Sequence, residues 1–553
     1  MTSQDKKVLA NINTYGDDIQ KATYELEGLD EDDSWSLFKR TVGNGNLTVR
    51  EFQELGRRMI KKCGGVPLAI RALGDLLRNK SVEKWDEVEK HPVWHKEDGI
   101  LPSLELSFNY LPNVALKKCF SYCAIFFKED EVIQKDKLIQ MWMAQGFLQP
   151  YDNMEVVGED FVDILLNSSL FQKANFDQLG NVITFKIHEL VSSLAHIASG
   201  EECSNLENIL NFQDSLTTEV RHLSTTLLPG KDHPYLTSSF CGKLRTYYYC
   251  YPQVKHLQDC ESSELFLKYA RCLRVLCLHH LDLQNLPTSI GDLKHLRYLD
   301  ISQNCFETLP DVIINLYHLQ TLRIDYNTKR ELRCFLPQSK VCNLVSLRHI
   351  SAEFVDIGIL QGMGHLTSLR TLSTINLKSK WGGKASDLGS LNNLRGILAI
   401  SGLDAITDKE EARGIHLGRK SNVDKLILKW SMNLDEHSRA NGILQGLEPH
   451  DKLATLEVAH YNGSSFPQWL MVDTQGSQRH CNLVSLTLQH CLYAEGDLKL
   501  ENLTGLRFLL LECCDKLTIS FPEHGFQCCK LLESLKLISC NKVGNLPNLS
   551  PLT

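Results

Sequence analysis

A repeated six-residue phrase in the C-terminal half constrains the fold more than any other feature of the sequence. Apolar residues take its first, fourth and sixth positions, and the phrase begins at Leu273, Leu296 and Leu319. The step is 23 residues each time (296 − 273 and 319 − 296). Alternating apolar positions predict a short strand with one buried face. One such unit cannot bury that face alone, so the units must stack on one another.

This phrase and period are those of leucine-rich repeats, which recur every 20–29 residues or so. The first positions of the phrases are Leu244, Leu273, Leu296, Leu319, Leu347, Leu369, Leu394, Val423, Leu453, Leu483, Leu506 and Leu532. The steps vary from 22 to 30 residues, which predicts insertions on the outer side, and the phrase at Leu394 is out of register by one residue. We therefore expect a curved solenoid over residues 219–553, with its strands on the concave face that such solenoids use for contacts.

Asparagine and cysteine residues recur where each strand turns toward the outer side. Backbone groups need an inward partner at that point, and an amide or a thiol can supply one. This predicts a structural role, without catalysis, for Asn304, Asn327, Cys491, Cys514 and Cys540. Cys119 and Cys123 lack the accompanying Cys/His set of a zinc site, so we interpret them as buried thiols.

A run of tyrosines lies in the first phrase. The repeat pattern turns Tyr247 and Tyr249 inward, whereas Tyr248 and Tyr251 are candidates for the outer surface. The run can therefore be core or contact surface, and the pattern favours core.

Two helical segments precede the repeats. Residues 27–99 read as helices, with Pro67 at the first turn of one of them, where its missing N–H costs nothing. The apolar face of that helix should carry Leu68, Leu73, Leu76 and Leu77. Residues 100–198 combine short helices with an alternating strand at 182–187, which fits a winged-helix unit, and residues 199–218 read as a polar linker.

Bulk composition excludes few functions. A net charge of −8 and a pI near 6.2 give no support for a nucleic-acid or membrane-surface role that rests on overall charge. The sequence has no apolar run long enough for a membrane span and no apolar leader, which predicts a cytosolic, reducing location. The 19 cysteines are then expected to be thiols.

Nucleotide hydrolysis is not expected of this polypeptide. A phosphate-binding loop needs a glycine-rich turn followed by Lys and then Ser or Thr. Lys231, Lys243 and Lys384 follow glycines, but the next residues are Asp232, Leu244 and Ala385. His188, at the start of a predicted helix, could meet an anionic ligand or could simply cap that helix, and its sequence context leaves both open.

Five motifs, in order, resemble those of one protein family. They are residues 26–38, the run Cys-Gly-Gly-Val-Pro-Leu-Ala at 63–69, residues 119–126, residues 138–147, and Ile187-His188-Glu189-Leu190. Together they resemble the plant intracellular disease-resistance proteins of the nucleotide-binding, leucine-rich-repeat class with coiled-coil N-termini. The resemblance spans almost the whole chain and implies a multidomain α and α/β protein: helical subdomain, winged helix, then solenoid.

The resemblance also assigns a cofactor site. It implies ADP or ATP binding by Gly65, Pro67, Leu68 and His188, with the proline packing near the adenine and the histidine approaching the phosphates. Residues 1–26 would be the remnant of a nucleotide-binding domain in an N-terminally truncated chain that lacks the coiled coil, the phosphate-binding loop and the magnesium-binding strand. Ile187 and Glu189 replace the family's Met and Asp, and Phe127 replaces a proline.

The function that the resemblance implies is plant defence. The repeats would recognise a pathogen molecule or a guarded host protein and restrain a partial nucleotide switch, in the cytoplasm and also in the nucleus. The alternative is a catalytically inert repeat scaffold, or a regulator of full-length relatives, that binds no nucleotide. Neither hypothesis requires an enzyme, a metal, direct nucleic-acid binding or a membrane span.

Overall fold

The computed structural model of this protein describes most of its 553 residues. The described ranges are 27–43, 50–96, 101–126, 131–149, 153–177, 179–205, 219–225, 238–249, 266–281, 283–304, 306, 309–324, 341–352, 357–358, 362–372, 374–378, 383–431, 437–471, 482–500, 503–520, 531–540 and 542. None of the helices in these ranges is long and apolar enough to cross a membrane.

The chain divides into two compact units. The first comprises residues 1–113, 162–173 and 186–194, and the second comprises residues 114–161, 174–185 and 195–553. The helices of the first unit are α2 (Glu31–Val42), α3 (Arg50–Lys61), α4 (Pro67–Leu77), α5 (Val82–Glu89), the 3-10 helix η1 (Pro92–His95), α6 (Pro102–Asn109) and most of α10 (Glu189–Ser199).

Capping and aromatic packing explain the first helices. The Asp30 side chain accepts a hydrogen bond from the Asp33 N–H at 2.7 Å, and acidic residues fill the first turn of α2, where the helix dipole favours them. Phe38 and Trp85 are fully buried and meet edge to face at 5.7 Å between ring centroids. They form the centre of this unit's core.

The helix α4 starts at Pro67, as predicted, but its buried face differs from the prediction. Leu73 and Leu77 are fully buried, whereas Leu68 and Leu76 are only half-buried. Ala69 and Ile70 take the inner positions. Small residues on this face allow close packing against α2 and α6, to which α4 makes its main contacts.

The second unit begins with the segment predicted as a winged helix. Its elements are α7 (Val114–Tyr122), η2 (Cys123–Ile125), β1 (Ile133–Gln134), α8 (Lys135–Gln145), α9 (Met154–Asn167), β2 (Gln172–Phe176) and β3 (Val182–Lys186), of which α9 and the β2–β3 pair run partly into the first unit. The strand β3 lies between β1 and β2 in a small sheet, antiparallel to β1. Gly146, with φ +79°, ends α8 in the left-handed conformation that glycine adopts without strain.

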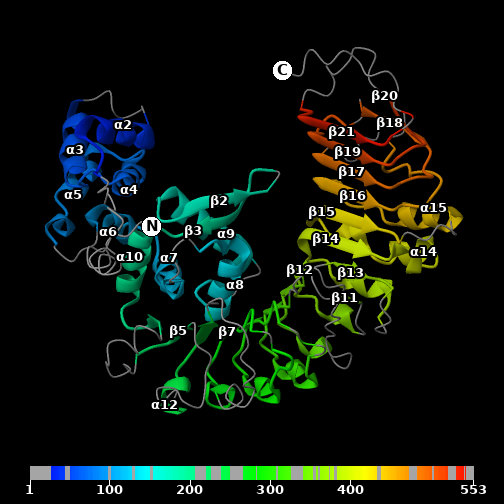
Figure 1. Ribbon diagram of the computed structural model, residues 1–553, viewed down its shortest axis with the longest axis horizontal. Helices are drawn as coiled ribbons and strands as arrows, with labels where there is room; N and C mark the ends of the chain where they lie inside the picture. The colour runs from blue at the N-terminus through cyan, green and yellow to red at the C-terminus, as the bar shows by residue number, and fades with distance from the viewer. Residues whose placement is uncertain are drawn as a thin grey trace, which may run out of the picture. The chain divides into compact units, whose positions relative to one another are not determined.

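The repeats form two parallel eight-stranded sheets in the second unit (Figure 1). The strands of the first are β4 (Cys203–Asn205), β5 (His222–Thr225), β6 (Thr246–Tyr249), β7 (Val275–Cys277), β8 (Tyr298–Asp300), β9 (Thr321–Arg323), β10 (His349–Ser351) and β12 (Thr371–Leu372). Those of the second are β11 (Ile357–Gly358), β13 (Ile375–Asn376), β14 (Arg395–Ser401), β15 (Asn422–Lys429), β16 (Thr455–Ala459), β17 (Ser485–Gln489), β19 (Phe508–Glu512) and β21 (Ser534–Ile538).

Shorter elements complete the second unit. They are the helices α12 (Ser238–Cys241), α14 (Lys409–Arg413) and α15 (His437–Gly446), the 3-10 turns η3 (Thr288–Asp292), η4 (Asp311–Asn315), η5 (Val341–Asn343), η6 (Met363–His365), η7 (Ala385–Ser390), η8 (Leu403–Ala405) and η9 (Leu417–Arg419), and the parallel pair β18 (Gly496–Lys499) and β20 (Leu517–Ser520).

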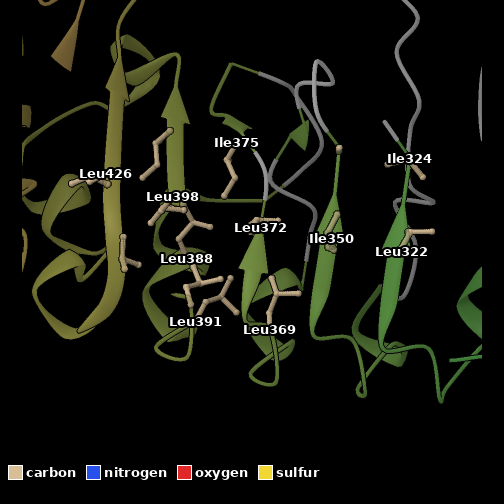
Figure 2. Packing of buried hydrophobic residues seen from close by; sticks show 14 of the residues in the cluster. Leu322, Ile324, Ile350, Leu369, Leu372, Ile375, Leu388, Leu391, Leu398 and Leu426 are labelled. Carbon is tan, nitrogen blue, oxygen red and sulfur yellow. The ribbon is translucent and has the colours of Figure 1, made fainter. Parts of the chain in front are cut away.

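All twelve predicted first positions of the phrases are buried in one continuous apolar core. Figure 2 shows part of it, to which β9, β10, β12 and β14 contribute Leu322, Ile350, Leu372 and Leu398. The predicted irregularity at Leu394 is real, since the pairing of β14 with β15 shifts between Gly396 and Ile397. Gly396 has φ +70°, a conformation that supports such a bulge.

The start of the sheet corrects the predicted linker. Residues 203–205, placed in the linker by their polarity, form β4 and pair in parallel with β5. The phrase at residues 220–225 was not recognised either, because Ser224 and Thr225 replace the usual apolar ending. The β18–β20 pair is a further element that the sequence analysis does not predict: Leu517–Ser520 alternates, but Gly496–Lys499 contains a single apolar residue.

The predicted inward amides and thiols are confirmed for the described residues. The Asn304 Nδ2 group donates to the Leu278 and Ile301 carbonyls at 2.7 and 2.9 Å, and its Oδ1 accepts from two backbone N–H groups. Cys491, Cys514 and Cys540 direct their thiols at backbone carbonyls of the same and the preceding repeat. Asn327 lies outside the described residues.

Candidate functional site

The four predicted cofactor residues belong to the first unit. Gly65 has φ +72° and packs so closely on the Leu29 backbone that a Cβ would meet the Leu29 carbonyl oxygen at 2.5 Å. Pro67 is exposed at the first turn of α4, and Leu68 beside it is half-buried. Val66, the residue that precedes α4, offers no side-chain acceptor, so this helix start is free of a side-chain cap.

His188 performs the capping role that the sequence left open. Its Nδ1 accepts a hydrogen bond from the Leu190 N–H at 3.1 Å at the start of α10, and the imidazole is half-buried. This leaves Nε2 as the ring nitrogen that a ligand could reach. The structure records no contact between His188 and Gly65, Pro67 or Leu68 among its described residues. The two helix starts suit an anionic group individually, and their use as one cofactor site stays a prediction.

A different site is better defined, and the sequence did not predict it. Side chains from residues 131–159 contact the strands of the first repeats through a series of buried polar bonds. We call this set the clamp: Gln134, Lys137, Gln145, Glu155 and Glu159 on one side, and Thr246, Arg274, Asp300, Arg323, Arg348, His349 and Arg395 on the repeats.

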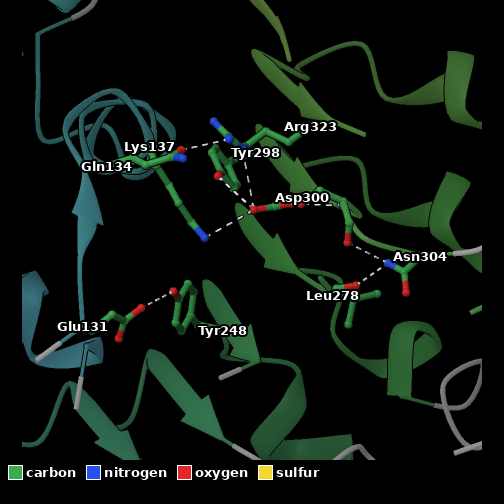
Figure 3. Close-up of polar contacts among 10 residues, drawn as sticks. Glu131, Gln134, Lys137, Tyr248, Leu278, Tyr298, Asp300, Asn304 and Arg323 are labelled. Atoms are coloured by element: carbon green, nitrogen blue, oxygen red, sulfur yellow. Dashed lines mark hydrogen bonds and ion pairs between the residues drawn. The ribbon is translucent and has the colours of Figure 1, made fainter. Parts of the chain in front are cut away.

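Asp300 in β8 is the centre of one part of the clamp (Figure 3). Its carboxylate is almost fully buried, with the Lys137 ammonium at 3.4 Å and the Arg323 guanidinium at 3.8 Å. The Arg323 Nη2 group also donates to Gln134 Oε1 at 3.0 Å. Burial opposes the charged form of Asp300, but Lys137 and Arg323 outweigh it and hold the pKa of this carboxyl below its ordinary value.

Glu155 in α9 forms a second part. Its carboxylate accepts from Arg348 Nε at 2.7 Å and Nη2 at 2.9 Å, a two-point geometry that favours strong pairing. His349 Nε2 donates to the same carboxylate at 3.1 Å, while His349 Nδ1 lies 3.0 Å from the Thr371 hydroxyl. Burial disfavours the charged carboxyl, yet the bonds from His349 and Arg348 keep the pKa of Glu155 below normal. Burial lowers the pKa of His349, because it disfavours the charged imidazolium.

One helical turn further along α9, Glu159 pairs with Arg395 at the start of β14. Glu155 and Glu159 are four residues apart, so both carboxylates lie on one face of the helix. This face follows the strands from β10 in the first sheet to β14 in the second. The clamp therefore holds α9 along several repeats rather than at one point.

The end of α8 meets the first strands. The Gln145 Nε2 group donates to the Thr246 hydroxyl at 2.7 Å, and the Gln145 carbonyl accepts from Arg274 Nη1 at 2.6 Å. Tyr122 and His222 lie 3.0 Å from the same Thr246 hydroxyl, and their rings meet edge to face. Burial, together with Arg245, Arg274 and Arg221, lowers the pKa of His222 to about 3. A neutral imidazole that accepts at Nδ1 satisfies this network.

Tyr248 resolves the question raised by the tyrosine run. Tyr247 and Tyr249 belong to the repeat core, as predicted. Tyr248 points out of that core but is only 2% exposed, because Phe126 packs on its ring, Lys137 lies above it and its hydroxyl donates to Glu131 at 3.0 Å. The tyrosine run thus contributes Tyr247 and Tyr249 to the repeat core and Tyr248 to the contact with the preceding segment. Tyr251 lies outside the described residues.

The chemistry of this site is that of a contact held by ion pairs and hydrogen bonds. Asp300 and Glu155 each have partners of opposite charge, and breaking such a buried pair costs about 3–5 kcal/mol because the remaining charge stays buried. No group of three or more His, Cys, Asp or Glu residues in the described ranges could hold a metal ion. Cys119 and Cys123 are buried free thiols whose pKa burial raises, in keeping with their predicted structural role.

Sequence signals for the clamp existed but were incomplete. Asp300 and Arg323 occupy strand positions between buried apolar residues, where a charged side chain must face outward from the core. Their partners stand 163 and 189 residues earlier in the chain (300 − 137 and 323 − 134). Spacing alone cannot identify such pairs.

Comparisons with known proteins match the winged-helix region and the later repeats. A model for the disease resistance protein winged helix domain covers residues 126–195, and a model described as R13L1/DRL21 LRRs covers residues 385–514. Disease resistance protein RGA2 of Solanum bulbocastanum is 32% identical over 459 residues, which are 81% of this chain and 43% of that protein. An RPP13-like disease resistance protein of Arabidopsis thaliana is 30% identical, over 85% of this chain and 45% of its own.

This chain therefore spans less than half the length of the curated relatives that it matches. Among solved structures, the plant peptide hormone receptor RGFR1, in complex with RGF2, is similar with a TM-score of 0.40 and 17% identity, over 60% of this chain and 53% of that one. A Leptospira interrogans leucine-rich-repeat protein is similar with a TM-score of 0.36 and 16% identity, over 60% of this chain and 86% of that one.

Proposed function

The chain belongs, over the segment that it spans, to the family of plant disease resistance proteins, and from this premise we propose that it acts as a defence receptor, or part of one, that works by binding and without catalysis. The observation that carries this proposal is the clamp. In it, strands of the repeats hold residues 131–159 through buried and half-buried charges. Recognition by the repeats would then be coupled to the position of α8 and α9.

The coupling follows from the energetics of buried ion pairs. Glu155 and Arg348 are stable in the low-dielectric contact only while both are present. A partner that competes for Arg348, or that shifts β10, leaves Glu155 unpaired and favours release of α9. The proposed resting state is the clamped one, and binding of a pathogen or host protein to the repeats favours the released one.

Expression of the full chain in leaf tissue tests this restraint. Arg348→Glu places two carboxylates side by side and should release α9, so the leaf should show more ion leakage than with the wild-type chain at equal protein level. Arg419→Glu makes the same charge change at an exposed turn outside the sheet, and it should behave like wild type. Equal or lower leakage with Arg348→Glu would reject the restraint.

A nucleotide is the second element of the proposal. ADP or ATP would supply a phosphate group whose charge suits the starts of α4 and α10. Pro67 is exposed there, α4 lacks a side-chain cap, and His188 Nε2 is the ring nitrogen left over by the cap to Leu190. Denaturing the purified chain and separating the released nucleotides by ion exchange tests this. Stoichiometric ADP supports a switch, whereas its absence favours the inert scaffold or regulator.

We also place the working protein in the cytoplasm, with the nucleus as a second location, and we expect protein partners rather than nucleic acid. The support is the family and the ordinary surface charge of the chain. A fluorescent fusion of the full chain in leaf cells tests this. Signal confined to the cell exterior would contradict it.

A further inference from the structure

Three free cysteines take the same position in successive repeats of the second sheet. Cys491 follows β17, Cys514 follows β19 and Cys540 follows β21, each two residues beyond the end of its strand. The strand β19 pairs in parallel with both β17 and β21. We call these three residues the thiol ladder. Paired strands lie about 4.8 Å apart, which falls within the Cα separation of about 4.4–6.8 Å that a disulfide spans.

The strand pairing continues into the turns that carry the first two thiols. One residue before Cys491, the His490 N–H donates to the Glu512 carbonyl at 2.8 Å. The two backbones therefore keep the separation of paired strands at this point. A disulfide needs its two Cβ atoms about 3.8 Å apart, so the turns would have to approach each other by about 1 Å for the bond to close.

The sulfur atoms of Cys491 and Cys514 lie together at the end of β17. The Cys491 thiol donates to the Gln489 carbonyl at 3.6 Å. The Cys514 thiol reaches back into the same repeat and donates to the Leu488 carbonyl, also at 3.6 Å. The two thiols are hydrogen-bonded to each other as well. The atoms that a disulfide would join are thus already in contact.

This hydrogen bond makes the two thiols unequal. The Cys491 thiol stabilises the thiolate of Cys514 and so lowers the pKa of Cys514, although burial opposes the charge. The same hydrogen bond and burial raise the pKa of Cys491. For Cys540, burial is the main influence, and it raises the pKa of that thiol. Cys514 is therefore the best nucleophile of the thiol ladder, and Cys491 remains a thiol beside it.

We propose that Cys491 and Cys514 form a redox modification site, which a peroxide converts into a disulfide that joins two neighbouring repeats. The Cys514 thiolate attacks one oxygen of hydrogen peroxide, the O–O bond breaks, and the leaving hydroxide takes up a proton to become water. Cys514 is then a sulfenic acid. The Cys491 sulfur attacks the Cys514 sulfur, a second water leaves, and the S–S bond forms. Two thiols and one peroxide thus give one disulfide and two waters.

The surroundings of the pair favour a small oxidant and a reversible bond. Cys491 and Cys514 are at most 1% exposed, which excludes a bulky oxidant such as glutathione disulfide from the folded chain. Leu492, directly after Cys491, is 38% exposed, so the turn itself lies at the surface, where hydrogen peroxide can reach it. A disulfide that draws two turns together is strained, and strained disulfides are readily reduced again.

This inference goes beyond the proposed function and does not depend on it. Neither the clamp nor the predicted cofactor residues include a cysteine, and oxidation is measured on the purified full chain without a partner or a nucleotide. Failure of the leaf experiment would leave the redox site intact, and failure here would leave the restraint intact.

Peptide mapping of the full chain tests the site. The reduced, folded chain is treated with hydrogen peroxide, its remaining thiols are alkylated in denaturant, and it is digested without reductant. We expect a linked peptide pair that contains Cys491 and Cys514, lacks two hydrogen atoms and disappears on treatment with dithiothreitol. Cys119 and Cys123 are the matched control, because burial raises the pKa of both of these free thiols. They should oxidise about tenfold more slowly.

Variants assign the two roles, while the mapping of the wild-type chain needs no variant to fold. Cys491→Ser removes the resolving thiol, so the sulfenic acid on Cys514 should persist and be trapped by dimedone. Cys514→Ser removes the attacking thiol, and Cys491 should then oxidise no faster than Cys119. Equal oxidation of the two pairs in the wild-type chain would overturn the proposal. So would a disulfide from Cys514 to Cys540, or one between two molecules.

Discussion

Asn304 shows how one buried side chain completes a repeat. Its amide satisfies two carbonyls and two N–H groups in the turns that follow β7 and β8. The sequence predicted this role because the repeat period puts Asn304 and the cysteines at the same position. Thiols make longer and weaker bonds there, as with Cys540 at 3.4 and 3.6 Å.

Asn304→Ala should therefore destabilise the repeats by about 2–4 kcal/mol, since several buried backbone groups lose the hydrogen bonds that Asn304 makes to them. Cys540→Ala, at the equivalent position of the last described repeat, should cost less than about 1 kcal/mol. Urea denaturation followed by circular dichroism measures both. Equal losses would show that the amide adds nothing beyond its volume.

His222 is a residue whose role the sequence did not reveal. The phrase pattern gives its place in β5, but its environment depends on Tyr122 and Gln145, about 100 and 77 residues earlier (222 − 122 and 222 − 145). Together with the arginines, these groups favour the neutral imidazole. His222 is thus a source of pH-dependent stability that only the folded contact creates.

The sign of this pH dependence follows from the lowered pKa. The unfolded chain takes up a proton on His222 near pH 6.5, whereas the folded chain resists protonation down to about pH 3. Stability should therefore fall as the pH is lowered through this range. His222→Gln should remove the uptake of about one proton on unfolding, so that stability falls less steeply as the pH is lowered. Urea midpoints measured between about pH 7.5 and pH 5 test this. An unchanged slope would contradict the assignment.

At the scale of elements, regular patterns were predictable and irregular ones were not. The strands from β6 to β21 whose phrases alternate cleanly were predicted, as were α8 with its glycine end and the strand β3 followed by α10. The early start of the sheet at β4 was missed because Cys203-Ser-Asn205 reads as polar. Only pairing with β5 makes it a strand.

Close packing between α8 and α9 is a second feature of elements that no pattern indicates. A Cβ on Gly158 in α9 would overlap Ile139 Cγ2 in α8. Glycine at this position therefore sets the distance between the two helices that carry the clamp. Glycine inside a helix costs stability because of its low helix propensity. The close contact with Ile139 therefore explains why Gly158 stands there.

Gly158→Ala should destabilise this helix pair by about 1–3 kcal/mol, because the added methyl group overlaps a buried side chain. Combining it with Ile139→Ala removes the overlapping atoms, so the double variant should be more stable than the sum of the two single losses predicts. Thermal unfolding of the three variants measures this. Simple additivity would contradict the close contact.

For the molecule as a whole, the sequence was informative about architecture and family but not about the contact that joins the parts. The winged-helix and repeat regions were predicted, and the comparisons agree with them. The clamp could not be predicted from the sequence, since Glu155 and Arg348 are separated by 193 residues. Gly65, Pro67, Leu68 and His188 remain a predicted cofactor site, supported by two helix starts whose joint use awaits the nucleotide measurement.

Hydrogen–deuterium exchange of the full chain tests the central claim, that buried charges hold α8 and α9 on the first repeats. Arg348→Glu should speed exchange at the amides of residues 135–145 and 154–161, while those of β16, β17 and β19 stay as protected as in the wild type. Arg419→Glu should leave both regions unchanged. Wild-type protection of α9 in Arg348→Glu would contradict the account.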